Sequence, residues 1–307
     1  MGFESLRNCY APTVIPALLL LCIYDPALTF NEDAGEGDFS FMKVQLVVAD
    51  LDGSLVITGQ PISRNNVKAI DYLHSKGIKF GIATGRNLFD IMRLPKRWKL
   101  DFDFDFYIGM NGSEVYDTAT GVRIDSYKLA PEDLKDIIMK MKPLGLNPFI
   151  LYRDGMMMGH EDAGAKSSSK RNEFKIYIAH DDSEMWQEEN AKIMFRVEEE
   201  KCDEIFAYAK SISNDRYKAV RTQKTMIEFV HPLIDKAKGL INYCDMYSIP
   251  LDEVVAFGDT TNDNEMLECC YGVCLENGTD DTKAIAKEVT VKTCEEDGFA
   301  DWIFKNI

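Results

Sequence analysis

Short apolar runs alternate with amphipathic segments along this chain of 307 residues. Three of the runs are rich in Val, Ile, Phe and Ala and are closed by turn residues, which predicts buried strands at residues 46–50, 79–83 and 253–257. Between the first two, apolar positions recur at helical spacing over residues 61–75, with Ser63 as a candidate N-cap and Gly77 as a candidate end. A strand, a helix and a strand in this order indicate a parallel pair joined by a crossover.

The same alternation returns near the C-terminus, where residues 235–249 and 262–270 predict helices on either side of the third strand. The stretch between the two halves mixes helix and strand signals. There we expect helices at 131–141 and 202–211, strands at 156–158, 175–179 and 193–197, and a flexible loop with three consecutive serines at 166–171. The pattern therefore predicts an α/β fold, a Rossmann-like core (42–116 and 222–307) with a parallel sheet and helices on both faces, interrupted by an inserted α+β domain at 117–221.

Composition and charge argue against several classes of protein. Apolar residues make up 46% of the chain, which is enough for a full hydrophobic core. The net charge of −16 argues against a nucleic-acid partner and against attachment to a membrane through basic residues. The eight cysteines include no C-x-x-C pair and no zinc-ligand spacing, which favours reduced thiols in a cytoplasmic protein. We expect a monomer or a weak homo-oligomer.

The N-terminal 41 residues follow a different pattern. Four consecutive leucines at 18–21 resemble the apolar core of a secretion signal. The flanks fit such a signal poorly, because Glu4 offsets Arg7 and three prolines interrupt the apolar run. Met42 stands directly before the first predicted strand and would be a natural start. We expect a disordered extension at 1–41 and keep secretion as the alternative.

Candidate chemistry gathers where the three predicted strands end. Asp50 closes the first strand and Asp52 follows it, Thr84 follows the second strand, and Gly-Asp-Thr-Thr-Asn-Asp at 258–263 follows the third. Functional sites of open α/β sheets lie outside the carboxyl ends of their strands, so these residues should lie close together. Two carboxylates at the mouth of a buried strand are costly without a cation, which favours a metal site. A simple turn, made by an aspartate before a glycine, is the alternative.

Four segments resemble the motifs of the haloacid-dehalogenase (HAD) phosphatase superfamily in order and spacing. They are Asp-Leu-Asp-Gly-Ser-Leu at 50–55, Ala-Thr-Gly-Arg at 83–86, Asp-Lys at 235–236 and Gly-Asp-Thr-Thr-Asn-Asp-Asn-Glu-Met-Leu at 258–267. The long segment between Thr84 and Lys236 is similar to the Cof-type members (subfamily IIB), in which an α/β cap is inserted between the second and third motifs. Ser54 stands where the family usually has Thr, a departure that keeps the hydroxyl group.

The resemblance implies a role for each matching residue. Asp50 would be the nucleophile that forms an aspartyl-phosphate, and Asp52 would transfer the proton. Mg²⁺ would be held by Asp50, the backbone carbonyl of Asp52 and Asp259, while Asp263 would support Lys236 or a metal-bound water. The phosphoryl oxygens would be held by Thr84, Gly85, Lys236 and Asn262, and Asn111 is a further candidate for substrate contact.

Several of these residues have simpler interpretations when taken singly. Lys236 could be a solvated lysine on a helix, Asp263 a helix N-cap and Thr84 the start of a turn. Asn111 could contact substrate or could only fill the turn of a hairpin.

The resemblance implies a Mg²⁺-dependent phosphatase for a small phosphorylated metabolite such as a sugar phosphate, with a cap that closes over the substrate. The alternatives are a phosphohexomutase of the phosphomannomutase type and a non-catalytic sensor of phosphorylated metabolites. The mutase carries a longer Gly-Gly insertion before its Asn-Asp pair, which the segment at 258–263 lacks. A sensor would have lost an active-site carboxylate, whereas Asp50, Asp52 and Asp259 are all present.

Overall fold

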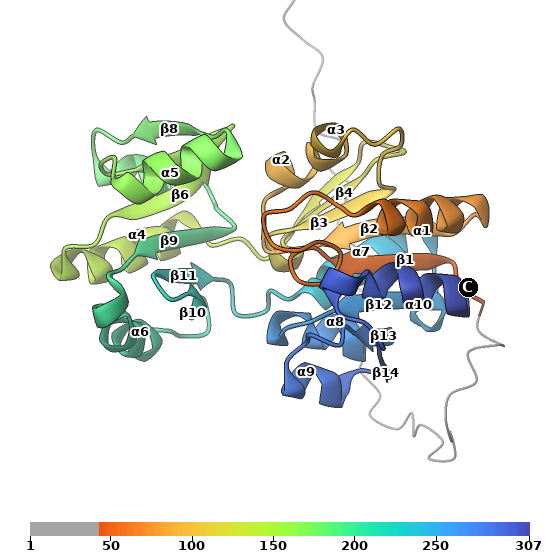
Figure 1. The fold of residues 1–307 in the computed structure, drawn as a ribbon. Coiled ribbons are helices and arrows are strands. Elements are labelled where there is room, and N and C mark those ends of the chain that lie inside the picture. Colours follow the sequence, from red (N-terminus) through yellow and green to blue (C-terminus); the bar gives the residue numbers. More distant parts are fainter. Residues whose placement is uncertain (1–42) are drawn as a thin grey trace, which may run out of the picture. The chain divides into compact units, whose positions relative to one another are not determined.

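The structure is a computed structural model that describes residues 43–307 (Figure 1). The extension predicted at 1–41 lies outside the described residues. The described chain forms two sheets, one of eight strands and one of six. Short 3-10 helices connect the elements at Met110–Gly112 (η2), Lys142–Leu144, Asp182–Trp186, Glu199–Lys201, Leu251–Glu253, Thr261–Asp263 (η7) and Cys294–Glu296.

The first sheet has the strand order β14-β13-β12-β1-β2-β3-β4-β5, parallel from β14 to β3 and antiparallel at β4 and β5. Its strands are β1 (Leu46–Asp50), β2 (Lys79–Ala83), β3 (Phe106–Gly109), β4 (Glu114–Asp117), β5 (Arg123–Asp125), β12 (Val254–Gly258), β13 (Tyr271–Cys274) and β14 (Glu288–Val289). The predicted strands at 46–50 and 79–83 match β1 and β2. All five residues of β1 are buried, as expected for a parallel strand between two helical layers.

Helices cover both faces of this sheet (Figure 1). They are α1 (Arg64–Ser75), α2 (Leu88–Ile91), α3 (Leu94–Trp98), α7 (Lys236–Tyr247), α8 (Asn264–Glu268), α9 (Asp280–Ile285) and α10 (Gly298–Asn306). On the face of α1 and α10, Phe299 packs against Phe80 and Phe257. On the face of α7, Tyr243 stacks on Phe106 with ring centroids 3.9 Å apart. The predicted α/β fold, with a Rossmann-like core, is confirmed.

The second sheet has the order β10-β11-β9-β6-β7-β8 and is antiparallel except for the pair β7–β8. Its strands are β6 (Pro148–Tyr152), β7 (Gly155–Met158), β8 (Lys175–Ile178), β9 (Lys192–Arg196), β10 (Lys218–Gln223) and β11 (Met226–Val230). Three helices accompany it, α4 (Pro131–Met141), α5 (Ala163–Asn172) and α6 (Cys202–Ser211). The helices predicted at 131–141 and 202–211 coincide with α4 and α6.

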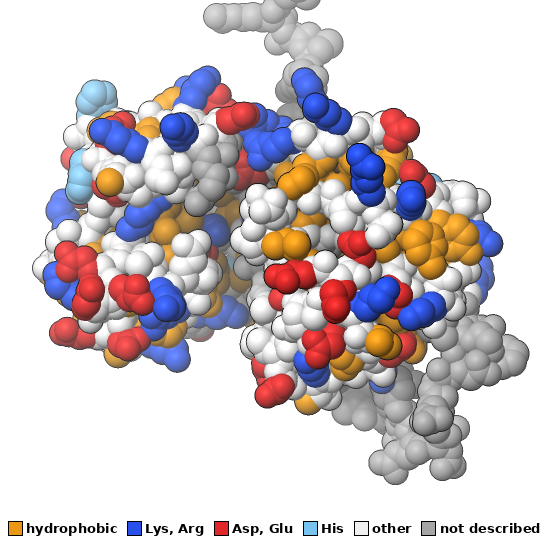
Figure 2. Space-filling view, viewed as in Figure 1, with side chains coloured by type: hydrophobic (Ala, Val, Ile, Leu, Met, Phe, Trp, Pro, Cys, Tyr) orange, Lys and Arg blue, Asp and Glu red, His pale blue; other side chains and the backbone are white. Residues whose placement is uncertain are grey.

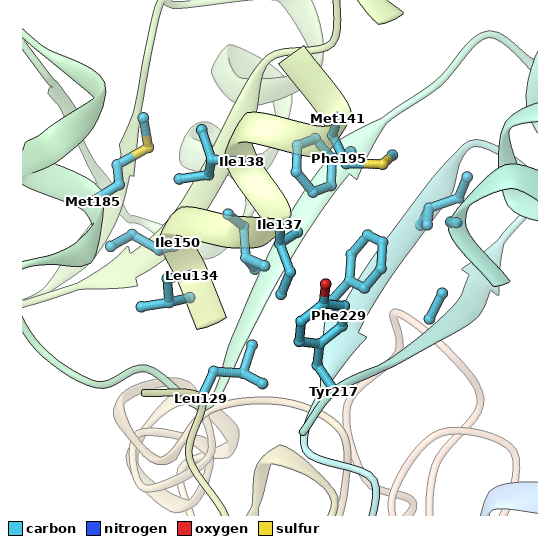
Figure 3. Packing of buried hydrophobic residues seen from close by; sticks show 14 of the residues in the cluster. Leu129, Leu134, Ile137, Ile138, Met141, Ile150, Met185, Phe195, Tyr217 and Phe229 are labelled. Carbon is cyan, nitrogen blue, oxygen red and sulfur yellow. The ribbon is translucent and has the colours of Figure 1, made fainter. Parts of the chain in front are cut away.

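A separate hydrophobic core holds this second sheet together. Apolar side chains of α4, among them Ile137 and Met141, point toward Phe195, Tyr217 and Phe229 from the strands and the loop before β10 (Figure 3). On the opposite face, Ala165 of α5 belongs to a smaller apolar cluster of β-strand side chains. The inserted region therefore has a core of its own, as a domain needs.

One predicted element in this region is wrong. Residues 166–171 were expected to form a loop because of their three serines, but they lie inside α5. The Asp162 side chain caps the helix by accepting a hydrogen bond from the Ala165 amide at 2.7 Å. Ala165 is fully buried, so the cap and this contact outweigh the weak helix propensity of serine.

The two sheets exchange along the chain at later residues than the predicted domain limits of 117 and 221. β4 and β5 extend the first sheet past residue 116, because the β3 edge offers unpaired backbone groups to the hairpin that follows it. β11, at Met226–Val230, belongs to the second sheet although its residues were expected in the core. The limits of the inserted domain stay a prediction.

Three further observations concern surface charge, thiols and helix length. On the face shown in Figure 2, acidic and basic side chains are interspersed. The cysteines of the described residues, which are Cys202, Cys244, Cys269, Cys270, Cys274 and Cys294, form no disulfide. Within residues 43–307, no helix has both the length and the apolar content needed to cross a membrane.

Candidate active site

Three neighbouring strands bring the candidate residues to one edge of the first sheet. β1 lies between β12 and β2, and Asp50 at its end pairs in register with Ala83. Thr84 follows β2 and Asp259 follows β12, so both lie beside Asp50 at the carboxyl edge. This is the edge at which open α/β sheets carry their functional sites.

Lys236 is the cation of this cluster. It is the first residue of α7, and the helix is capped by Asp235, whose side chain accepts a hydrogen bond from the Lys238 amide at 2.9 Å. The Lys236 side chain is fully buried. Its Nζ donates a hydrogen bond to Oδ1 of Asp50 and another, at 2.6 Å, to Oδ1 of Asp263. The interpretation of Lys236 as a solvated helix lysine is therefore wrong.

Asp263 uses its two carboxylate oxygens differently. Oδ1 accepts the hydrogen bond of Lys236, while Oδ2 accepts those of the Asp259 and Thr260 amides at 3.0 and 3.1 Å. The hydrogen bond from the Thr260 amide is half of a capping box at the start of η7, in which the Thr260 side chain accepts the Asp263 amide in return. Asp263 thus supports the start of η7 as its third residue, while at the N-cap position of α8, the role considered above, its side chain makes no capping hydrogen bond. Groups of the chain itself occupy both of its oxygens.

The turn after β1 approaches Asp259 closely. Ser54 Oγ donates a hydrogen bond to Asp259 Oδ1 at 2.9 Å. Gly53 has a φ of +98°, and a Cβ at this position would lie 2.4 Å from Asp259 Oδ2, so only glycine fits here. From the other side, Asn277 donates a hydrogen bond to the Gly53 carbonyl at 2.9 Å. The family motif at 50–55 includes Gly53 and Ser54 but implied no role for either residue, and Asn277 lies outside the four motifs.

Burial is the largest single influence on the pKa values of Asp50, Asp259 and Lys236. It raises the pKa of Asp50, an effect that the nearby Lys236 ammonium opposes. It also raises the pKa of Asp259 to about 6, against the hydrogen bond from Ser54. Burial disfavours the charge of Lys236, but Asp263 and Asp50 outweigh it and raise the pKa of this lysine. Three buried carboxyl groups lie close together with one lysine, which is bonded to two of them, so the cluster favours a further cation.

The donor set fits a hard divalent cation. Oxygen atoms of Asp50, Asp259 and Asp263 lie within 4.8 Å of one another, and all three residues are buried. Oxygen donors of this kind are the ligands that Mg²⁺ prefers. Because both oxygens of Asp263 already accept hydrogen bonds, Asp50 and Asp259 are better placed to bind the ion directly.

The carboxylate of Asp52 stands apart from this group of three. It forms a bidentate ion pair with Arg86, in which Nε donates to Oδ2 at 2.9 Å and Nη2 donates to Oδ1 at 2.5 Å. Sequence reasoning assigned no role to Arg86, although it lies in the same motif as Thr84. The signal in the sequence that could have identified Arg86 was its position directly after Thr84 and Gly85 in the motif.

Thr84, Gly85 and Asn111 lie next to one another. Thr84 is buried, and its carbonyl accepts a hydrogen bond from the Asn111 amide at 3.0 Å. Asn111 has a φ of 54° in η2, the turn between antiparallel β3 and β4, as the hairpin interpretation expects. Its Oδ1 is buried and has no hydrogen-bond partner among the described residues, and a Cβ on Gly85 would lie 3.2 Å from it. An unpartnered oxygen beside Thr84 supports a substrate contact, which stays a prediction.

Asn262 is the candidate that the structure leaves at the rim. It is exposed, and its Oδ1 accepts a hydrogen bond from the Thr260 hydroxyl. It directly precedes Asp263, so it lies near the cluster without contacting Asp50 or Lys236 through a hydrogen bond in the described residues.

This fold and this buried site define an α/β protein with a cluster of carboxylates and one lysine at the carboxyl edge of a Rossmann-like sheet. Residues 47–303 match the family model of haloacid dehalogenase-like hydrolases, and the chain belongs to this family. The solved structure of TM0651 from Thermotoga maritima superposes with a TM-score of 0.77 at 26% identity, covering 85% of this chain and 97% of that one. The HAD subclass IIB sugar phosphatase BT4131 superposes with a TM-score of 0.72 at 23% identity, covering 86% of this chain and 100% of its own.

Sequence relatives point the same way. The 5-amino-6-(5-phospho-D-ribitylamino)uracil phosphatase YitU of Bacillus subtilis is 28% identical over 271 residues, which cover 85% of this chain and 97% of YitU. The predicted membership of the HAD phosphatase superfamily, with its Cof-type fold, is confirmed, and so is the prediction of an enzyme.

Proposed function

We propose that this HAD-family phosphatase is a Mg²⁺-dependent phosphomonoester hydrolase that acts on a small phosphorylated metabolite through an aspartyl-phosphate. The observation that carries the proposal is the buried cluster at the ends of β1 and β12. There Lys236 binds Asp50 and Asp263, and Asp259 lies within reach of the same cation site. An anionic phosphate can approach an anionic carboxylate only where cations offset both charges.

Mg²⁺ would be held by Asp50, Asp259 and the backbone carbonyl of Asp52. When bound, it supplies positive charge that draws the phosphoryl group toward Asp50. Asp263 would hold Lys236 in place, and Lys236 in turn would orient the Asp50 carboxylate. Thr84, Gly85, Lys236 and Asn262 would bind the phosphoryl oxygens, and the unpartnered Oδ1 of Asn111 would accept a hydrogen bond from the substrate.

The reaction would have two halves. An oxygen of Asp50 attacks phosphorus, the bond to the ester oxygen breaks, and the leaving oxygen takes the proton of Asp52. Water then attacks the phosphorus of the aspartyl-phosphate and gives a proton to Asp52. The bond between phosphorus and Asp50 breaks, inorganic phosphate leaves, and both aspartates return to their starting state.

The substrate class is proposed from the relatives. YitU is named for a phosphate ester on a ribityl chain, which supports a phosphorylated sugar or sugar alcohol as the substrate. The inserted domain would cover the substrate and keep water out. A cytoplasmic site of action and a monomeric or weakly associated state remain predictions.

A screen of phosphomonoesters tests this function. The purified protein should release inorganic phosphate from some members of the panel with Mg²⁺ present, and release should stop when EDTA removes the metal. Absence of Mg²⁺-dependent release from every ester would refute the proposal. An isomerised sugar phosphate without release of phosphate would identify a mutase instead.

Asp50→Asn is the decisive variant of the screen. We expect it to fold and to lose phosphate release completely, because the amide cannot attack phosphorus. Asp71→Asn, an exposed residue on α1, is the matched control and should keep full activity. Turnover by Asp50→Asn would show that another residue is the nucleophile.

A further inference from the structure

Arg86 has no role in the mechanism above, yet it binds the residue that would transfer the proton. Its guanidinium donates to both oxygens of Asp52, at 2.9 Å from Nε and 2.5 Å from Nη2. The two side chains are about one third and one quarter exposed, at 34% and 27%. A bidentate pair of this kind fixes the orientation of the carboxylate as well as stabilising its charge.

Both partners are anchored through their backbones. The Arg86 amide donates to Thr84 Oγ1 at 3.3 Å, and its carbonyl accepts the Met110 amide at 2.8 Å. Asp52 precedes Gly53, whose carbonyl is held by Asn277. The ion pair therefore joins the segment after β2 to the turn after β1. The Asp52 side chain lies outside the group formed by Asp50, Asp259 and Asp263, and each of its two oxygens accepts a hydrogen bond from Arg86.

We propose that Arg86 is a positioning residue that holds Asp52 for proton transfer, an inference that rests on the proposed phosphatase function. Once Asp52 has given its proton to the leaving oxygen, it is a carboxylate, and the guanidinium holds this form ready to take a proton from the attacking water. Arg86 acts through Asp52, the residue that its guanidinium binds.

A double-mutant cycle tests this role, with p-nitrophenyl phosphate as the probe and kcat and KM measured for each protein. Asp52→Asn should lower kcat by about 10²- to 10⁴-fold, the usual contribution of acid–base catalysis. Arg86→Met should lower kcat by about 10- to 100-fold with little change in KM, because orientation and not binding is lost. In the Asp52→Asn background, Arg86→Met should change kcat by less than about 2-fold, since its partner is no longer able to transfer a proton.

Two further variants keep the test clear. Arg86→Lys keeps the charge without the planar fork, so it should recover only part of the lost kcat, and it covers the case in which Arg86→Met does not fold. Arg64→Met, an exposed arginine on α1, is the control and should match the unmodified protein.

Three outcomes would overturn the proposal. An equal loss of kcat from Arg86→Met in both backgrounds would mean that Arg86 acts independently of Asp52. A rise in KM at constant kcat would assign Arg86 to substrate binding. Full recovery by Arg86→Lys would mean that charge alone suffices. Failure of the proposed phosphatase function looks different, because the unmodified protein would then release no phosphate.

Discussion

The two sheets of this protein are built alike but bury different side chains. Both carry helices on their faces, and both are filled by aromatic and aliphatic residues. In the first region, however, the buried set includes Asp50, Asp259, Asp263 and Lys236. The second region buries two acidic residues, Asp133 and Glu228, among the described residues, and Glu228 is paired with Lys192 at 2.9 Å.

This difference separates what maintains the fold from what performs the chemistry. Burying a charge costs free energy that apolar packing must offset, so a cluster of buried charges indicates a function that needs them. The second region is stabilised by apolar contacts, with Phe195, Tyr217 and Phe229 at its centre (Figure 3). We therefore expect substitutions in the first region to reduce activity most and substitutions in the second region to reduce stability most.

Lys236→Met is the variant for which we expect the largest loss of activity, and it tests the first region. It leaves Asp50 and Asp263 buried without their cation. We expect kcat to fall by at least about 10²- to 10³-fold, the cost of losing one electrostatic contact to the transition state. Steady-state release of phosphate measures the effect. Lys68→Met, an exposed lysine on α1, is the control, and a similar kcat for both variants would contradict the assignment.

Phe229→Ala tests the second region. Phe229 is fully buried and packs edge-on against Phe195 and Tyr217. We expect the free energy of unfolding to fall by about 3–5 kcal/mol. At temperatures where the variant stays folded, its kcat should change far less than that of Lys236→Met. Unfolding in urea gives the first quantity, and Met139→Ala on the exposed side of α4 is the control. A large loss of kcat without a loss of stability would reverse the comparison.

The smallest expected effect is a change in thermal stability caused by Asp90, a buried carboxyl group that the proposed mechanism does not use. Burial raises the pKa of Asp90 to about 6 from the usual 3.8, against the attraction of Arg86, Arg97 and Arg93. Because the folded state holds the proton more tightly than the unfolded state, ionisation of Asp90 destabilises the fold as pH rises from about 4 to 6. Asp90→Asn should therefore raise Tm by roughly 2–4 °C at pH 7.5.

The same variant should gain less at pH 5, where the Asp90 carboxyl is largely protonated in the folded state. Thermal unfolding at the two pH values measures the difference. Asp71→Asn, whose side chain is exposed, should show no such pH dependence. A lower Tm for Asp90→Asn at pH 7.5 would mean that the ionised carboxylate stabilises α2.

Sequence patterns were most informative where burial is strongest. The strands at 46–50 and 79–83 and the helices at 131–141 and 202–211 were predicted with the bounds of β1, β2, α4 and α6, because apolar periodicity directly reflects the buried face. The helix α5 was missed, since its stability comes from the Asp162 cap and the burial of Ala165 and not from its own periodicity.

The sequence indicated which residues form the site, but it did not indicate which of their side chains contact one another. The motifs pointed to Asp50, Thr84, Lys236 and Asp259, and the strand order brings them to one edge. The partner of Asp52 was not predictable, because Arg86 lies 34 residues away and its direction depends on side-chain packing. Nor could a sequence pattern indicate that one carboxylate, Asp263, would serve as both helix cap and lysine partner.

The sequence distance between Asp50 and Lys236 also matters while the protein is being made. The two residues are 186 positions apart, and Asp259 and Asp263 follow Lys236. A ribosome has therefore synthesised the whole second sheet before the cation that Asp50 needs leaves the exit tunnel. Until then Asp50 has neither Lys236 nor the neighbouring carboxylates of Asp259 and Asp263. On the mechanism proposed above, a growing chain would cleave no phosphate ester until residues 236–263 have emerged and reached Asp50.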